Sequence, residues 1–138
     1  MITKLRKRIE SEKGFTLIEM LIVIIILGIL LAIAVPAYLK FKDRANNNAA
    51  AADIRAMIPA VEAYNADNNG YAGMQIGGTG ASSLQATYDT ALKGAPTVTI
   101  LSKSASTYCI RSTVGNATAY KSGPQGDIIV NPASPTCS

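Results

Sequence analysis

An uninterrupted apolar segment of eighteen residues lies between Glu19 and Tyr38, with the sequence MLIVIIILGILLAIAVPA. Eighteen uncharged residues are enough for a helix to cross the hydrocarbon core of a bilayer. The carboxylate of Glu19 stands directly before this segment, where its burial in hydrocarbon would be costly. The segment therefore predicts a membrane-spanning helix, and the position of Glu19 requires an explanation.

The residues around this segment do not have the pattern of an ordinary secretory signal peptide. The apolar run is longer than the roughly 7 to 15 residues of such a signal, and no A-x-A-like cleavage site follows it before Lys40. The small residue that a peptidase could accept, Gly14, precedes the run. The segment upstream of it is basic, with the cations Lys4, Arg6, Lys7, Arg8 and Lys13. Cleavage after Gly14 would leave the apolar helix in the mature chain.

The basic leader, the heptapeptide KGFTLIE from Lys13 to Glu19 and the long apolar helix resemble the class III signal of type IV pilins and the related pseudopilins. The resemblance covers residues 13–38, about a fifth of the chain. It implies cleavage after Gly14 by a membrane aspartyl prepilin peptidase, N-methylation of Phe15, and packing of the freed helices into a filament core. The new amine of Phe15 would then pair with Glu19 of the same or a neighbouring subunit and set the register of assembly. The alternative is that Glu19 reaches the membrane interface alone.

Three residues are expected to disturb the helix. Gly28 lacks a side chain, while Pro36 and Pro59 each remove a backbone donor. For Gly28 and Pro36, the simpler interpretations are tolerated packing and a kink. The resemblance implies instead that the segment between them loses helical order during assembly. Pro59 predicts only a gentle kink.

The cations on the two sides of the apolar segment predict its orientation in the membrane. Five cations in the leader exceed the three that follow the span, Lys40, Lys42 and Arg44, so the positive-inside rule places the N-terminus in the cytoplasm and the remainder outside. The expected locations are the cytoplasmic membrane for the precursor and an extracellular pilus after assembly. Cys109 and Cys137, the only cysteines, would then lie in an oxidising compartment and form one disulfide.

The net charge of the chain is +4, but removal of residues 1–14 leaves eight cations against seven acids. This near-neutral product gives no support for nucleic-acid binding through bulk charge. The chain has 138 residues, which predicts one domain. Its 49 % hydrophobic content and mean hydropathy of +0.22 reflect the membrane segment more than a large globular core.

The helix is predicted to continue beyond the membrane. The stretch after Lys40 is rich in alanine, a strong helix former, and apolar residues recur at three- and four-residue steps at Ala50, Ile54, Met57, Ile58, Val61 and Tyr64. This spacing is typical of an amphipathic helix. We therefore expect one helix from Phe15 to about Asn68, with its Ile54 face against a head domain, ended by the Asn-Gly-rich sequence at 67–70.

The remainder predicts a small antiparallel β-sheet. A glycine-rich loop should cover residues 70–83, and a short helix should run from Ser82 to Leu92, capped by Ser82 or Ser83 and stopped by Gly94. Four short runs rich in Val, Ile, Thr and Tyr predict strands at 97–101, 107–112, 118–121 and 127–130. The expected fold is α+β and pilin-like, divided into a leader (1–14), a membrane helix (15–38), an amphipathic helix (39–68) and a β head (69–138).

Catalytic sites are not predicted. The chain has no histidine, the commonest general base and metal ligand, and its two cysteines form no zinc or redox motif. Residues 65–70 imitate the start of an EF-hand, but Ile76 stands where the bidentate glutamate is needed. Helix termination is the better interpretation. We expect no enzyme activity, metal or cofactor. The sequon at Asn116 is a weak pattern that often arises by chance.

These observations favour a structural pilin subunit of a type IV pilus-like filament, a class associated with cell adhesion and motility. The resemblance implies a homo-oligomeric helical filament, with a prepilin peptidase, an assembly ATPase, a membrane platform and, in two-membraned cells, a secretin as partners. Three alternatives remain. They are a pseudopilin of a type II secretion system, a minor or competence pilin that binds DNA, and an ordinary protein with a single membrane span. A disulfide near the C-terminus favours a pilin over a major pseudopilin, because it resembles pilin heads.

Overall fold

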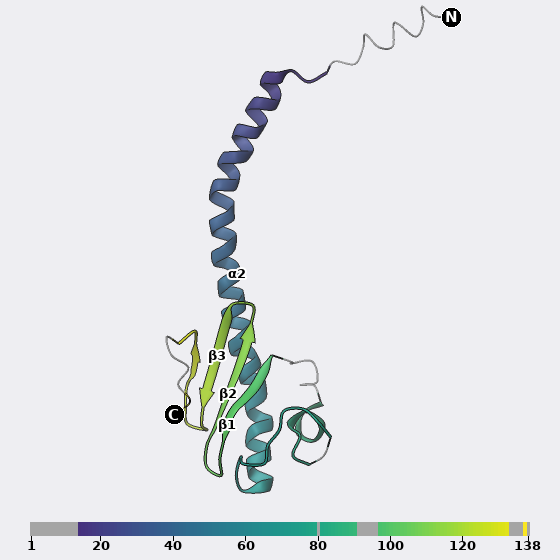
Figure 1. Cartoon of the computed structure of the whole chain (residues 1–138), viewed down its shortest axis with the longest axis vertical. Helices are drawn as coiled ribbons and strands as arrows, with labels where there is room; N and C mark the ends of the chain where they lie inside the picture. The colour runs from purple at the N-terminus through teal and green to yellow at the C-terminus, as the bar shows by residue number, and fades with distance from the viewer. Residues whose placement is uncertain (1–13, 80, 91–96, 133–136, 138) are drawn as a thin grey trace, which may run out of the picture. The chain divides into compact units, whose positions relative to one another are not determined.

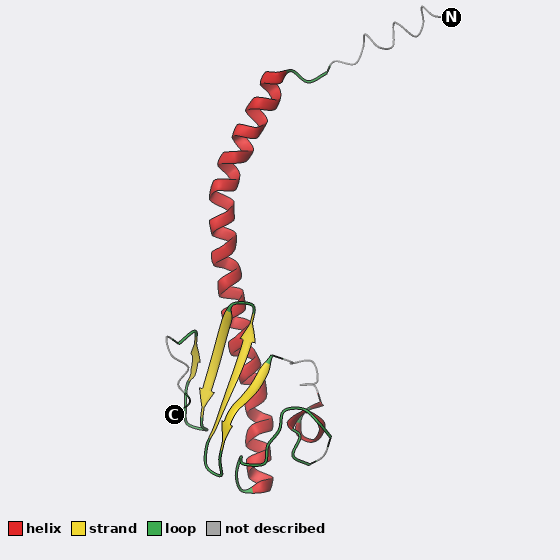
Figure 2. Ribbon diagram, viewed as in Figure 1, coloured by secondary structure: helices red, strands yellow, loops and turns green. Residues whose placement is uncertain are grey.

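A computed structural model describes residues 14–79, 81–90, 97–132 and 137 of the chain. Contacts divide the chain into two compact units, residues 1–40 and 41–138. One long helix contributes to both units, and a four-stranded sheet lies in the second (Figures 1 and 2). The elements are α2 (Leu17–Asn68), the π-helix η1 (Leu84–Tyr88), β1 (Val98–Lys103), β2 (Tyr108–Val114), β3 (Ala117–Ser122) and β4 (Ile128–Val130). The predicted α+β architecture, an apolar N-terminal helix with a small antiparallel sheet, is confirmed.

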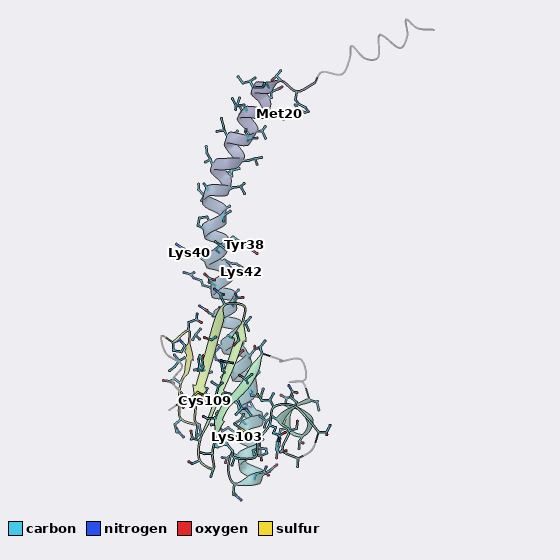
Figure 3. The ribbon with its side chains drawn as sticks, in the orientation of Figure 1. Met20, Tyr38, Lys40, Lys42, Lys103 and Cys109 are labelled. Atoms are coloured by element: carbon cyan, nitrogen blue, oxygen red, sulfur yellow. A yellow bond between two sulfur atoms is a disulfide. The ribbon has the colours of Figure 1, made fainter. Side chains whose placement is uncertain are left out.

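The part of α2 in the first unit is apolar and uncovered. Its most apolar eighteen-residue window has a mean hydropathy of 3.2, and none of that window is buried. The side chains of Met20 and Tyr38, labelled in Figure 3, lie near the two ends of the apolar run and are both exposed. Length and composition therefore make this part of α2 a candidate membrane span.

The part of α2 in the second unit supplies one wall of the core. Its apolar face is buried as predicted, with Ile54, Met57 and Val61 fully inaccessible and Ile58 partly buried. These side chains pack in one cluster with residues of the strands, including Tyr108 and Ile110. A helix rich in alanine can approach the sheet closely at such positions, so the head is built on this face of α2.

The end of α2 has the predicted chemistry. Asn69 and Gly70 follow the last helical residue with positive φ angles of 52° and 153°, which asparagine and glycine accept most readily. The side chain of Asn68 donates a hydrogen bond to the Tyr64 carbonyl at 2.9 Å. A Cβ at Gly70 would lie 2.7 Å from the carbonyl oxygen of Ala105. Helix termination is therefore the role of the segment that imitates an EF-hand.

The predicted helix from Ser82 to Leu92 is largely wrong. The structure has only the single turn η1, which ends at Tyr88, while Leu92 and the predicted stop Gly94 lie outside the described residues. The predicted cap is correct, because the Ser83 hydroxyl accepts a hydrogen bond from the Ala86 amide at 3.2 Å. Leu84 is fully buried in the core, and tertiary packing of so short an element outweighs local helix propensity.

The sheet is antiparallel, with the strand order β1-β2-β3-β4. The four predicted strands match the observed ones to within two residues. The β1–β2 pairing shifts register between Ile100 and Ser102. This irregularity and the charge of Lys103 mark β1 as a protected edge strand, while the other edge, β4, has only three residues.

Polar side chains attach α2 to the sheet at several points. The carboxylate of Asp53 accepts hydrogen bonds from the Thr97 and Ser112 hydroxyls at 2.6 and 2.9 Å. Nearer the start of the head, the Asn116 side chain donates to Asp43 and accepts from Asn46, both at 2.9 Å. The Asp53 contacts are partly buried and satisfy groups that would be costly to leave without partners, whereas the Asn116 contacts are exposed and give the sequon a structural role.

Two tyrosines share one carboxylate beside the end of α2. The hydroxyl of Tyr71 donates to Glu62 at 2.9 Å, and that of Tyr108 donates to the other oxygen at 3.3 Å. The two rings lie 4.8 Å apart. Burial, followed by the hydrogen bond and negative charge of Glu62, raises the pKa of Tyr71 to about 12. Burial and the charge of Glu62 also raise the pKa of Tyr108.

These pKa shifts predict that the head loses stability at alkaline pH. An unfolded tyrosine ionises near pH 10, whereas the folded Tyr71 keeps its proton until about pH 12. The stabilisation is therefore complete below pH 10 and is lost as the pH rises towards 12. Denaturant titrations of the detergent-solubilised chain measure the free energy of unfolding at a series of pH values across this range. The slope of that free energy against pH gives the number of protons released on unfolding, and Tyr71→Phe should reduce this number by about one. The exposed Tyr38→Phe is the control, and an equal effect of both variants would contradict the assignment.

The head is also closed by a disulfide. Cys109 of β2 is bonded to Cys137, with their Cα atoms 5.7 Å apart. Cys109 is buried and Cys137 is exposed. The bridge joins the C-terminal tail to β2, which pairs with both β1 and β3. A small head of this kind has a limited core, so covalent closure is a useful supplement.

We expect loss of the bridge to lower the free energy of unfolding by about 3.5 kcal/mol, as the chain-entropy model gives for a loop with a sequence separation of 28. Cys137→Ser tests this most directly, because its side chain is exposed and Cys109 is left in place. Cys109→Ser should cost more, since it also places a hydroxyl at a buried position. Denaturant titration with and without reductant measures both. Two free thiols in protein collected outside the cell would contradict the bridge.

Candidate processing and assembly site

The segment from Gly14 to Glu19 contains the residues just before α2 and the first residues of that helix. Gly14, Phe15 and Thr16 precede the helix, which begins at Leu17. The predicted start at Phe15 is therefore two residues early. These three residues have no regular secondary structure and Phe15 is 81 % exposed, so the peptide bond between Gly14 and Phe15 is accessible. A peptidase requires an accessible bond of this kind.

Thr16 and Glu19 form a reciprocal helix cap. The Glu19 carboxylate accepts hydrogen bonds from the Thr16 amide and hydroxyl, both at 2.8 Å, and the Thr16 hydroxyl accepts from the Glu19 amide at 3.3 Å. This is the capping box, in which threonine and a glutamate three residues later satisfy each other's free amides. It explains why the helix begins after Thr16. The pattern T-x-x-E was visible in the sequence and was missed there.

The cap leaves part of the Glu19 carboxylate available. Both bonds from Thr16 end on Oε2, and no hydrogen bond to Oε1 occurs among the described residues. A carboxylate can accept several donors, so Oε1 remains able to bind an ammonium group. Within one chain, the capping box thus fixes the orientation of the Glu19 side chain and leaves one carboxylate oxygen free to accept further hydrogen bonds.

Gly28 and Pro36 lie inside α2, which continues through both positions and through Pro59. A Cβ at Gly28 would meet no atom within 4 Å. No contact within the described chain therefore requires a glycine there. A requirement for Gly28 would have to come from other molecules or from a change in helical order, so its role in flexibility remains a prediction.

Metal chemistry has little basis in the described parts of the chain. No group of three or more His, Cys, Asp or Glu side chains there comes close enough together to hold an ion. The carboxylates of Asp53 and Glu62 instead each accept hydrogen bonds from two hydroxyl groups. The functional features of the described residues are therefore the exposed apolar helix and its capped start.

Comparison with known families gives one match, to the model described as the prokaryotic N-terminal methylation motif, over residues 11–35. The matched residues include Gly14, Phe15, Glu19 and most of the apolar run. No solved structure matches the chain.

Curated relatives extend this match. The chain is 38 % identical to the type IV wide pilus major component of Thermus thermophilus over 104 residues, which are 73 % of this chain and 72 % of that protein. It is 42 % identical to the type II secretion system core protein G of Pseudomonas aeruginosa over 49 % of this chain and 48 % of that protein. It is 38 % identical to the type IV major pilin of Myxococcus xanthus over 44 % of this chain and 27 % of that protein. The chain therefore belongs to the family of type IV pilins and the related type II secretion pseudopilins, whose members are structural subunits.

Proposed function

We propose that this chain is a pilin, the repeating structural subunit of a type IV pilus-like filament. The observation that carries this choice is the extent of the match. Similarity to the pilus component of Thermus thermophilus covers 73 % of the chain, and so must include part of the head. Similarity to the secretion core proteins of Pseudomonas aeruginosa and Klebsiella michiganensis covers 49 % and 46 %.

In this proposal the precursor spans the cytoplasmic membrane with its N-terminus in the cytoplasm and its head outside. A prepilin peptidase cuts after Gly14, Phe15 is N-methylated, and the freed apolar helices pack together in the filament core. The exposure of the apolar part of α2 supports this, because one chain alone leaves that surface uncovered. Assembly would need an ATPase and a membrane platform, with no catalysis by the chain itself.

A pseudopilin of a type II secretion system is the second candidate. It is favoured by identities of 41–42 % to secretion core proteins, slightly above the 38 % to the pilus component. The disulfide at Cys109 supports the pilin instead, by resemblance to pilin heads. DNA binding by a minor or competence pilin has no support, since the processed chain carries only one excess cation.

Shearing of the native cells tests the proposal. A pilin should be released as long surface fibres, which electron microscopy and intact-mass measurement of the fibre protein would identify. A pseudopilin at its native level should stay with the cell envelope. Its loss should block secretion of exoproteins without removing any surface fibre. That second outcome would contradict the pilin assignment.

A further inference from the structure

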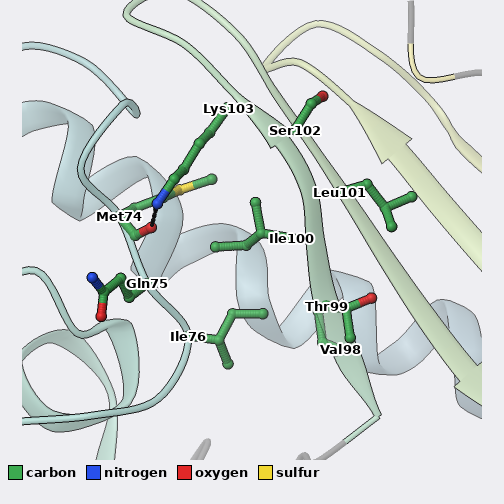
Figure 4. Close-up of a pocket in the computed structure, with 9 residues that line it drawn as sticks. All are labelled: Met74, Gln75, Ile76, Val98, Thr99, Ile100, Leu101, Ser102 and Lys103. Atoms are coloured by element: carbon green, nitrogen blue, oxygen red, sulfur yellow. Dashed lines mark hydrogen bonds between the residues drawn. The ribbon is translucent and has the colours of Figure 1, made fainter.

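An apolar cleft opens in the head between β1 and the segment Met74–Ile76. Its volume is about 450 Å³. Ile76 and Ile100 point into this space from opposite sides (Figure 4), and both are only partly buried. Their apolar surface therefore remains accessible from outside the head, next to the free edge of the sheet.

Lys103 closes one end of the cleft. Its ammonium group donates a hydrogen bond to the Met74 carbonyl at 2.5 Å (Figure 4). An ammonium group has three donors, so this contact holds the charge beside the cleft and leaves two donors for another acceptor. The Lys103 side chain is exposed. The cleft thus combines an apolar floor with a fixed positive charge.

The opposite edge of the sheet carries a complementary pair of side chains. Ile129 of β4 is 47 % exposed. Among the described residues that follow Phe41, it and Leu101 are the only large apolar side chains this accessible. Asp127, two residues earlier, is exposed and makes no hydrogen bond or ion pair with any described residue. The β4 edge therefore offers an apolar side chain and an unpaired carboxylate.

The strand order places these two surfaces on opposite edges of one sheet. Neither surface can therefore fill the other within a single head. A contact between two different surfaces of identical copies is heterologous, and repetition of such a contact generates a ring or an open helical filament. The occupant that fits the cleft by charge and polarity is thus the β4 edge of a second copy.

We propose that heads in the filament join edge to edge, with Ile129 of one copy in the β1 cleft of the next and Asp127 facing Lys103. This proposal rests on the proposed filament function. It assigns a specific head contact in addition to the packing of the apolar helices. Burial of Ile129 would supply the apolar part of the contact, and the pair of opposite charges would set its orientation.

Photo-crosslinking in intact filaments tests the contact. The full chain carries benzoylphenylalanine at position 129, and sheared fibres are irradiated and digested. The expected adducts join position 129 of one copy to residues 74–76 or 98–103 of another copy. The same probe at Thr113, which is exposed on β2, is the matched control and should give no adduct with the cleft. Fibres whose position 129 crosslinks elsewhere would overturn the proposal while leaving the pilin function intact.

Charge exchange provides a second measurement. Asp127→Lys and Lys103→Asp should each lower the yield of sheared fibres about tenfold or more, because each places like charges opposite one another. The double variant should recover most of the yield. Loss of the hydrogen bond from Lys103 to Met74 cannot explain such a recovery, because that bond is absent from the double variant as well. Failure of the double variant to recover would contradict the pairing of these residues. Absence of fibres from wild-type cells would contradict the filament function, and the head contact with it.

Discussion

Replacement of Gly14 with leucine is expected to stop maturation almost completely. The chain should accumulate in the membrane as a precursor that is longer by the 14 leader residues, and no filaments should form. The physical reason lies in the peptidase, whose pocket is expected to accept only a small residue before the cut. A Cβ at Gly14 would meet no atom of the chain within 4 Å. The substitution therefore leaves the fold of the precursor unchanged.

Intact-mass measurement distinguishes the outcomes. Wild-type filament protein should begin at Phe15 and carry one additional methyl group. Gly28→Leu is the matched control for processing, because position 28 also has open space around it but lies inside the helix. That variant should be cut normally, whatever it does to assembly. A mature chain that begins at another residue, or one that retains Met1, would contradict the assignment of the cleavage site.

The elements that the sequence predicted best are those whose pattern is strong and local. The buried face of α2 at Ile54, Met57 and Val61 follows directly from helical periodicity. The helix end at Asn69 and Gly70 follows from residues that tolerate positive φ. The strands were located because β-branched and aromatic runs alternate with turn residues. Each of these signals is contained in a few neighbouring residues.

The features that the sequence analysis placed wrongly or missed depend on contacts between distant residues. In place of the helix expected from Ser82, the structure has the single turn η1, because Leu84 packs in a core formed mainly by α2 and the strands. Asp53 has no special pattern in the sequence, yet it joins Thr97 and Ser112. The cleft beside β1 likewise brings together Ile76 and Ile100, which no local rule connects. Such pairings require the fold to be known first.

The start of α2 shows a different kind of failure. Glu19 was interpreted through its cost in an apolar environment, and either through its pairing with Phe15 or through its reach to the membrane interface. The capping box with Thr16 gives the same residue a second role that needs no other subunit. A test of the assembly role must therefore separate the cap from the charge. The sequence provides the variants that do this.

Glu19→Ala is expected to permit membrane insertion and cleavage but to abolish filaments or reduce them sharply. It removes the carboxylate and the two hydrogen bonds that the carboxylate accepts from Thr16, but it leaves the Thr16 hydroxyl able to accept from the backbone amide of residue 19. Thr16→Ala keeps the carboxylate and removes the two hydrogen bonds of the Thr16 hydroxyl, which typically costs about 1 kcal/mol of helix stability, and should reduce filament yield modestly. The apolar helix is long, so fraying of its first turn is a small loss. Quantification of sheared fibres against the amount of processed subunit in the membrane measures each variant.

Glu19→Gln separates charge from hydrogen bonding. Glutamine also serves in a capping box, so this variant keeps the cap and the size of the side chain, but it cannot neutralise the Phe15 ammonium group. Leaving that ammonium group unpaired among packed apolar helices should be far more costly than losing a cap. We therefore expect Glu19→Gln to resemble Glu19→Ala. If Glu19→Gln produced fibres in wild-type amounts, the contact between residue 19 and the Phe15 amine would be polar and not ionic. If Glu19→Ala produced fibres in wild-type amounts, Glu19 would only cap its own helix.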